Sequence, residues 1–130
     1  MTAIDDNPDA ADSLAELLEL GNHTIEIAYS SAEGLEKARN FKPEVVICDI
    51  GLPEMDGYQV ARAMRSDPAL ASARLIALTG YARAQDAAKA MEAGFDAHLA
   101  KPPSIEALER ALGESLQTVH EMGLEPIRPF

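Results

Sequence analysis

The sequence predicts a doubly wound α/β fold, in which helices cover both faces of a parallel β-sheet. Short apolar segments alternate with helical patterns along the chain at the spacing of βα units. Two of these segments, residues 44–50 and 74–78, lack the alternation of a half-exposed strand, which is typical of strands buried on both faces. In such sheets the connections are right-handed, and ligands bind at the carboxyl ends of the strands.

Five strands and five helices are expected in alternation. The strands are expected at residues 2–4, 24–28, 44–50, 74–78 and 96–100, and the helices at residues 9–20, 30–40, 58–65, 83–93 and 104–119. The first strand is about half the usual length of five or six residues, which indicates a chain cut within or just before it. Residues 1–122 are assigned to the domain and residues 123–130 to a loose tail.

Local signals mark the ends of the helices. Asn7, followed by proline, is placed as the N-cap of the first helix. Ser30 and Glu33 form a capping box before the second helix, Asp56-Gly57 forms a turn into the third, and Gly94 ends the fourth. The fourth helix is expected to turn Ala84, Ala87, Ala88 and Met91 toward the core, and the last carries an apolar stripe of Ile105, Leu108, Leu112, Leu116 and Val119.

The composition favours one compact intracellular domain. The chain has 130 residues, 47% of them apolar, and two full domains do not fit in this length. A formal charge of −11 argues against binding to nucleic acid or to an anionic membrane, and favours a basic partner or a bound cation. There is no membrane-spanning run and no signal-peptide pattern. The single cysteine, Cys48, forms no internal disulfide and is expected to pack in the core, so the reducing cytoplasm is the expected compartment.

Five polar residues are predicted to meet at the carboxyl edge of the sheet. Asp5 and Asp6 follow the first strand, Asp49 the third, Thr79 the fourth and Lys101 the fifth. Three carboxylates repel one another unless a cation lies among them, and oxygen ligands suit Mg²⁺. Together with the metal, the ammonium and the hydroxyl would hold a phosphoryl group. The central carboxylate, Asp49, can then act as a nucleophile and form an acyl phosphate.

Four segments, in order and in register, resemble the receiver domains of two-component response regulators. They are Ile4-Asp5-Asp6-Asn7, the run from Val45 to Gly57, Leu78-Thr79-Gly80 and Lys101-Pro102, and the resemblance extends from Ile4 to about Leu116. It implies a CheY-like, flavodoxin-like three-layer (βα)5 sandwich with strand order 2-1-3-4-5. The Leu-Thr-Gly-Tyr and Phe-Asp-Ala-His-Leu stretches are similar to receivers at the C-terminal end of hybrid histidine kinases.

The resemblance also implies roles for the acidic residues. Asp49 is the phosphoacceptor by this comparison. Asp6 and Asp49 would bind Mg²⁺ directly, Asp5 would support the ion largely through water, and the backbone carbonyl of Gly51 would complete the protein ligands.

Three residues near the fourth and fifth strands complete the implied site. Thr79 and Lys101 would contact the phosphoryl oxygens, and the bond between Lys101 and Pro102 is expected to be cis. His98 stands three residues before the lysine, where relatives usually carry a Tyr or Phe that turns inward on phosphorylation. Both a switch role and a partly exposed strand position are open for His98.

The implied function is a phosphorylation switch. A histidine kinase or histidine phosphotransfer domain would phosphorylate Asp49, and the chain would promote only its own phosphorylation and dephosphorylation. The fourth helix, fifth strand and fifth helix would signal to a downstream protein or a covalently linked output or kinase domain, with room for a phosphorylation-dependent dimer. One alternative is a phosphate-independent interaction module, suggested by His98 and the short first strand. The other is a Mg²⁺-dependent aspartyl-phosphate phosphatase, although Gly51 stands where such enzymes carry a second Asp.

Overall fold

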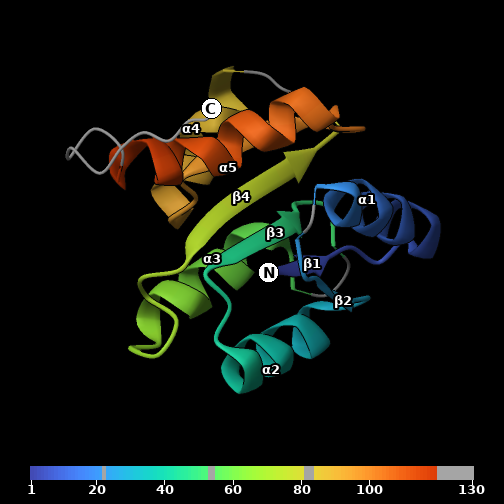
Figure 1. Ribbon diagram of the computed structural model, residues 1–130. Coiled ribbons are helices and arrows are strands. Elements are labelled where there is room, and N and C mark those ends of the chain that lie inside the picture. Colours follow the sequence, from blue (N-terminus) through green and yellow to red (C-terminus); the bar gives the residue numbers. More distant parts are fainter. Residues whose placement is uncertain (22, 53–54, 81–83, 120–130) are drawn as a thin grey trace.

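Five parallel strands form one sheet in the order β2-β1-β3-β4-β5, as the resemblance implied (Figure 1). The computed structural model describes residues 1–21, 23–52, 55–80 and 84–119. In this part of the chain the strands are β1 (Thr2–Ile4), β2 (Glu26–Ala28), β3 (Val45–Asp49), β4 (Arg74–Thr79) and β5 (Ala97–Ala100). The helices are α1 (Pro8–Leu20), α2 (Ser31–Phe41), α3 (Gly57–Ser66), α4 (Ala84–Ala93) and α5 (Ile105–Val119).

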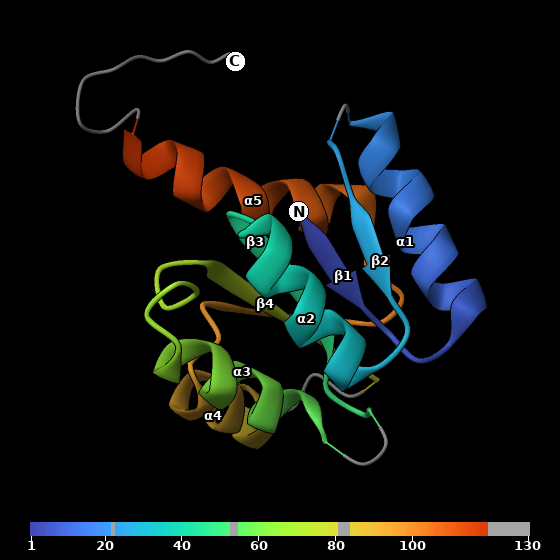
Figure 2. The ribbon, with the colours of Figure 1, turned by 90° about the horizontal axis from the view of Figure 1, so that it is seen from below.

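The helices form two layers, one on each face of the sheet (Figure 2). Leucines of α1 and α5 pack on one face against alternate strand residues such as Ile47 and Ile76. Residues of α2, α3 and α4 pack on the other face against Val46, Cys48 and Leu75. Neighbouring residues of β3 therefore enter opposite cores, which confirms the prediction of a strand buried on both faces.

The helix starts follow the capping signals with one difference. The Asn7 side chain accepts hydrogen bonds from the backbone N–H groups of residues 9 and 10, at 3.0 and 3.3 Å, so the predicted N-cap is confirmed. The predicted capping box of Ser30 and Glu33 is only half formed. Ser30 Oγ accepts from Glu33 N at 3.1 Å, but the Glu33 carboxylate reaches one residue further back and accepts from Tyr29 N at 2.8 Å. The complete capping box is formed at α3 by Asp56 and Gln59.

The strand bounds differ from the predicted ones where pairing limits them. The second strand was predicted over residues 24–28, yet β2 is only three residues long. Its partner in the sheet is β1, which also has three residues, and the two pair residue for residue from Thr2 opposite Glu26 to Ile4 opposite Ala28. An edge strand extends only as far as its neighbour offers hydrogen-bonding groups, so the short first strand shortens the second.

The predicted inward face of α4 is wrong for Ala88 and Met91. Ala88 is exposed and Met91 is 67% exposed, Ala87 is half-buried, and the buried residues are Ala90 and Ala93. Alanines occur on both sides of this helix, so the spacing of apolar residues does not distinguish the two faces. In α5 the predicted stripe is confirmed at the buried Leu108 and Leu112, and Ile105 is half-buried. The side chains of Ala84, Leu116 and Val119 and the predicted tail over residues 123–130 lie outside the described part.

No helix among the described residues combines the length and the apolar character needed to cross a lipid bilayer.

Candidate functional site

The five predicted polar residues do come to one edge of the sheet. Asp5 and Asp6 follow β1, Asp49 ends β3, Thr79 ends β4 and Lys101 follows β5. Because β1 pairs with β3, β3 with β4, and β4 with β5 in parallel, the carboxyl ends of these strands are neighbours. The sheet register therefore brings together residues that lie up to about a hundred positions apart in the sequence.

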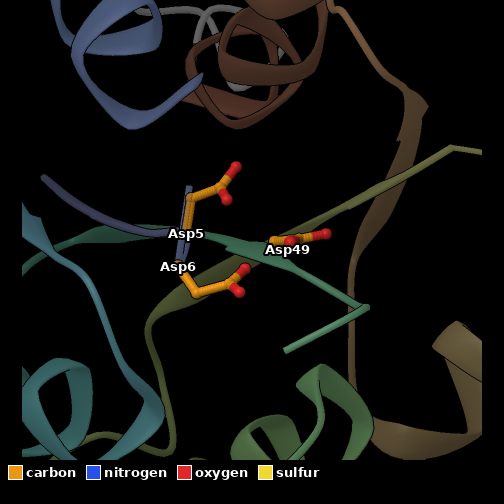
Figure 3. Close-up of side chains that lie close together, drawn as sticks. All are labelled: Asp5, Asp6 and Asp49. Atoms are coloured by element: carbon orange, nitrogen blue, oxygen red, sulfur yellow. The ribbon is translucent and has the colours of Figure 1, made fainter. Parts of the chain in front are cut away.

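Three carboxylates cluster at the ends of β1 and β3 (Figure 3). One oxygen each of Asp5, Asp6 and Asp49 lies within 4.8 Å of the others. Asp5 and Asp49 are only 1% and 7% exposed, whereas Asp6 is exposed. Asn7 N donates to Asp5 Oδ1 at 3.0 Å, and Gly51 N donates to Asp49 Oδ1 at 3.2 Å. Each of the two buried carboxylates therefore has one oxygen oriented by the backbone.

Lys101 provides a positive charge at the same site. Its Nζ lies 3.2 Å from Asp5 Oδ2 and 3.5 Å from Asp49 Oδ2. Its backbone N donates to the carbonyl of Thr79 at 2.7 Å, which places the lysine beside the end of β4. The bond to Pro102 is cis, as expected from the sequence. Thr79 itself is half-buried at the neighbouring strand end.

Burial and charge have opposing effects on the titration of these groups. Burial raises the pKa of Asp49, and the Asp5 carboxylate raises it further, against the opposing effects of the Gly51 N–H group and Lys101. Burial alone would lower the pKa of Lys101, but the carboxylates of Asp49 and Asp5 together raise it above its usual value. The Lys101 ammonium therefore stays charged at neutral pH. The raised pKa of Asp49 means that its ionised form destabilises the folded state.

The donor set fits a hard divalent cation. Three carboxylates face one ammonium in this cluster, so the group carries excess negative charge that a cation would neutralise. Mg²⁺ prefers oxygen ligands and usually keeps several of its water molecules when it binds to a protein. Asp6 is exposed, so the site is open to solvent on that side and has room for such waters. Asp5, Asp6 and Asp49 would hold the ion. The role of the Gly51 carbonyl stays a prediction.

Gly57 packs against the backbone at Asp49 in a way that the sequence did not reveal. A Cβ at this position would lie 2.7 Å from both the carbonyl oxygen of Asp49 and Cα of Ile50. Gly57 N also donates to the carbonyl of Ile50 at 3.0 Å. The start of α3 thus packs directly on the backbone of Asp49 and Ile50, a contact that only glycine permits. The turn signal of Asp56-Gly57 predicted the helix start but not this contact.

Cys48 and His98 stay outside the acidic cluster. Cys48 is buried in the core, as expected, and burial raises the pKa of its thiol, which leaves it in the inert thiol form. His98 lies in β5 opposite Ala77 and is half-buried. Its Nε2 is buried and has no hydrogen-bond partner among the described residues. Its role as a switch stays a prediction.

A cavity of about 410 Å³ lies next to the cluster, between α1 and the segment that follows β5. Asp5 and Lys101 line it, so it adjoins the acidic site. Its remaining walls are mostly apolar and include Leu14, Leu17, Leu78, Pro102 and Pro103. The exposed side of α1 carries carboxylates at helical spacing, at Asp9, which lines the cavity, and at Asp12, Glu16 and Glu19.

Comparisons with known proteins agree with this geometry. A family model described as the response regulator receiver domain matches residues 1–113. An uncharacterized 14.6 kDa protein of Leptolyngbya boryana is 34% identical over 99 residues, which are 76% of each chain. The signal transduction histidine-protein kinase BarA of Escherichia coli K12 is 31% identical over 110 residues, which are 85% of this chain but 12% of the kinase.

Solved structures show the same architecture. A putative response regulator from Chloroflexus aurantiacus matches with a TM-score of 0.84 at 27% identity, over 89% of this chain and 95% of that one. The strand order 2-1-3-4-5 with a helix after each strand is that of the CheY-like flavodoxin fold.

Proposed function

This chain belongs to the response regulator receiver domain family, and on that premise we propose that Asp49 accepts a phosphoryl group from a phosphohistidine donor in a Mg²⁺-dependent reaction. The observation that carries this proposal is the convergence of three carboxylates and an ammonium at the ends of β1, β3 and β5. The chain acts as a signalling acceptor that promotes its own phosphorylation and dephosphorylation, and it does not turn over a separate substrate.

The two oxygens of Asp49 have different surroundings. Oδ1 accepts the Gly51 N–H group, whereas Oδ2 faces Lys101 Nζ at 3.5 Å. Oδ2 is therefore the oxygen that forms the new bond to phosphorus, while the bond from phosphorus to the imidazole nitrogen breaks and the released imidazole takes up a proton. When bound by Asp5, Asp6 and Asp49, Mg²⁺ supplies positive charge that neutralises the phosphoryl oxygens.

Lys101 and Thr79 act on the transferred group. The Lys101 ammonium stays charged because the two carboxylates raise its pKa, and it can pair with a phosphoryl oxygen once Asp49 has become an acyl phosphate. The Thr79 hydroxyl, at the adjacent strand end, donates to another phosphoryl oxygen. Movement of Thr79 then shifts the population of two arrangements of α4, β5 and α5, the surface that signals to a downstream protein or a linked output domain. His98, in β5, is placed to take part in this shift.

The donor is a histidine kinase or histidine phosphotransfer domain whose imidazole must approach Asp49 closely. The apolar cavity beside the cluster can receive apolar side chains next to the donor histidine. The carboxylates on α1 favour donors with basic residues around that histidine, and they disfavour nucleic acids and anionic membranes. We place this exchange in the cytoplasm, in keeping with the free, buried thiol of Cys48.

The test is the intact mass of the protein after incubation with acetyl phosphate, with and without Mg²⁺. The native chain is expected to gain the mass of one phosphoryl group only when Mg²⁺ is present, and Asp49→Asn to gain none. Glu92→Gln, which removes an exposed carboxylate from the last turn of α4, is the control and should be labelled like the native chain. Labelling that survives in Asp49→Asn would refute the assignment.

Two other results would favour the alternatives. No adduct on a folded native chain would favour a phosphate-independent interaction module. Steady release of phosphate from a model ester would favour the phosphatase, although Gly51 stands where such enzymes carry a second Asp.

A further inference from the structure

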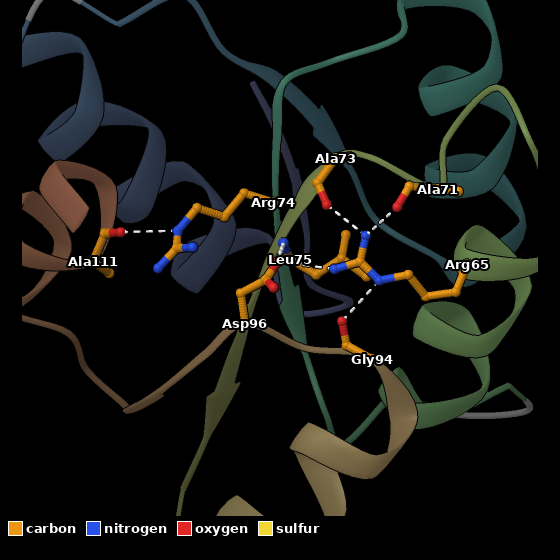
Figure 4. A network of polar contacts seen from close by, with 8 residues as sticks. All are labelled: Arg65, Ala71, Ala73, Arg74, Leu75, Gly94, Asp96 and Ala111. Carbon is orange, nitrogen blue, oxygen red and sulfur yellow. Dashed lines mark hydrogen bonds and ion pairs between the residues drawn. The ribbon is translucent and has the colours of Figure 1, made fainter. Parts of the chain in front are cut away.

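A second polar network lies at the opposite edge of the sheet from the acidic cluster (Figure 4). The network centres on Arg65, the penultimate residue of α3. Its Nε donates to the carbonyl of Gly94 at 2.9 Å, and Nη1 donates to the carbonyls of Ala71 and Ala73 at 2.7 and 2.6 Å. Nη2 lies 2.8 Å from Asp96 Oδ2. One guanidinium therefore joins the end of α3, the segment before β4 and the turn between α4 and β5.

The residues around Arg65 reinforce this junction. Asp96 Oδ2 also accepts from Leu75 N at 2.9 Å, and Asp96 N donates to the carbonyl of Leu75 at 2.7 Å. Gly94, which ends α4, has a φ of 116°. A Cβ there would lie 2.7 Å from Cγ of Arg65, so the backbone packs directly on the stem of the arginine. The C-terminal end of α4 is thus held by hydrogen bonds, an ion pair and close backbone contact.

Over residues 86–89, the described side chains of α4 are half-buried or exposed. Among its described side chains, over residues 86–93, the buried ones are Ala90 and Ala93, both small and both in the last four residues of the helix. Ala88, Lys89 and Met91 are exposed. Among the described side chains of α4, little apolar area therefore packs on the sheet, and what there is lies beside the Arg65 network. The N-terminal end of α4 lies toward the edge of the sheet where β4 ends at Thr79.

We propose that Arg65 is the pivot of α4: it fixes the C-terminal end of the helix to α3 and β4, so that α4 moves mainly at the end nearest the acidic cluster. Arg65 is a positioning residue in this proposal and takes no part in phosphoryl transfer. The link to signalling rests on the proposed function, but the pivot itself is a property of the unphosphorylated chain.

The test is amide hydrogen exchange of the unphosphorylated protein, read by mass spectrometry on peptides. In Arg65→Met, which keeps an unbranched side chain but removes the hydrogen-bond donors, the peptide over residues 86–97 is expected to exchange about tenfold faster. Peptides from β1 and β3 should keep their native rates. The matched control is Arg62→Met, an exposed arginine one turn earlier on α3, which should change neither region.

A second variant tests the same proposal in case Arg65→Met does not fold. Asp96→Asn keeps an oxygen that can accept the Leu75 N–H group and removes only the charge that pairs with Arg65, so it should accelerate exchange in the same peptide by a smaller factor. Exchange that rises uniformly over all peptides, or that is unchanged in residues 86–97 of both variants, would overturn the pivot.

The proposed function is judged separately by the phosphoryl adduct on Asp49. Arg65→Met is expected to form this adduct to the native extent, because Arg65 lies at the other edge of the sheet. Absence of the adduct in both proteins would refute the proposed function and leave the exchange result standing. If the native chain and Arg65→Met both form the adduct, phosphorylation of the native chain should alter hydrogen exchange mainly in the first half of α4. Phosphorylation of Arg65→Met should alter exchange along the whole helix. The same pattern in both would overturn the role of the pivot in signalling.

Discussion

Replacing Asp49 by asparagine is expected to stabilise the metal-free protein at neutral pH. The ionised carboxylate is buried and shares its surroundings with two others, within 4.8 Å of one another. Burial, with a further contribution from Asp5, raises the pKa of Asp49, which means that folding opposes its ionised form. An amide of similar shape removes that charge and keeps an oxygen that can accept the Gly51 N–H group.

The magnitude follows from the distances. At an effective dielectric constant of about 20, two like charges at the upper limit of 4.8 Å repel by about 3 kcal/mol, and the contact with Lys101 Nζ at 3.5 Å contributes about 5 kcal/mol of attraction. Repulsion from Asp5 and Asp6 together exceeds this attraction slightly, although solvent screens the exposed Asp6. We therefore expect Asp49→Asn to raise the free energy of unfolding by about 1 kcal/mol, or the melting temperature by roughly 3–5 °C.

The difference should depend on pH. A carboxyl whose pKa is raised on folding stabilises the native state fully below its ordinary pKa of 3.8, and this contribution is lost as the pH rises through the raised value. The native chain and Asp49→Asn should therefore be almost equally stable in acid, where Asp49 is neutral. The difference between their free energies of unfolding should grow as the pH rises and stay constant once Asp49 is fully ionised.

The assay is thermal and urea unfolding in EDTA, with Glu92→Gln on the exposed side of α4 as a control that removes one charge outside the cluster. Saturating Mg²⁺ should reverse the order, because a ligand at a hundred times its Kd stabilises the native chain by about 2.7 kcal/mol and Asp49→Asn binds it weakly. A variant that is less stable than the native chain in EDTA at neutral pH, or that gains as much from Mg²⁺, would refute this reasoning.

Three further substitutions can be checked by urea unfolding. Gly57→Ala should lower the free energy of unfolding by about 2–3 kcal/mol and slow labelling of Asp49, because its Cβ would overlap the backbone of Asp49 and Ile50. Gly80→Ala, whose Cβ would meet no atom of the described residues within 4 Å, is the control and should have no comparable effect. Thr2→Val should stabilise by about 1 kcal/mol, since the buried Thr2 hydroxyl has no partner among the described residues. Lys101→Met should destabilise by about 2 kcal/mol in EDTA, allowing for its 27% exposure, and the loss should shrink in Mg²⁺; an equal loss in both conditions would contradict the electrostatic explanation.

Much of the fold could be predicted because its signals are local. Asn7 and Pro8 mark the start of α1 whatever surrounds them, since a cap satisfies backbone groups within its own turn. The continuous apolar run of β3 predicts burial on both faces. The strand order needed the resemblance to a known family. The extent of β2 could not be predicted, because it depends on the three residues that β1 offers as a partner.

The predictions were weakest where packing distinguishes chemically similar residues. The alanines of α4 are nearly equivalent in the sequence, and their burial follows from the rotation of the helix against α3 and the sheet. Arg65 likewise resembles its neighbour Arg62 in the sequence, yet only Arg65 reaches the carbonyls before β4 and after α4. Such contacts depend on distances between elements, which no local pattern records.

For the candidate site, the sequence alone determined which groups are present and at which strand ends they stand, from Asp5 to Lys101. A parallel sheet places every carboxyl end on one edge, so strand positions suffice to predict their convergence. Only the tertiary structure decided that Asp5 and Asp49 are buried while Asp6 is exposed, that Lys101 pairs with both buried carboxylates, and that Gly57 packs on the backbone that follows β3. The physical reason is that burial and pairing depend on distances of a few ångströms between segments remote in the chain, which register and helix packing determine.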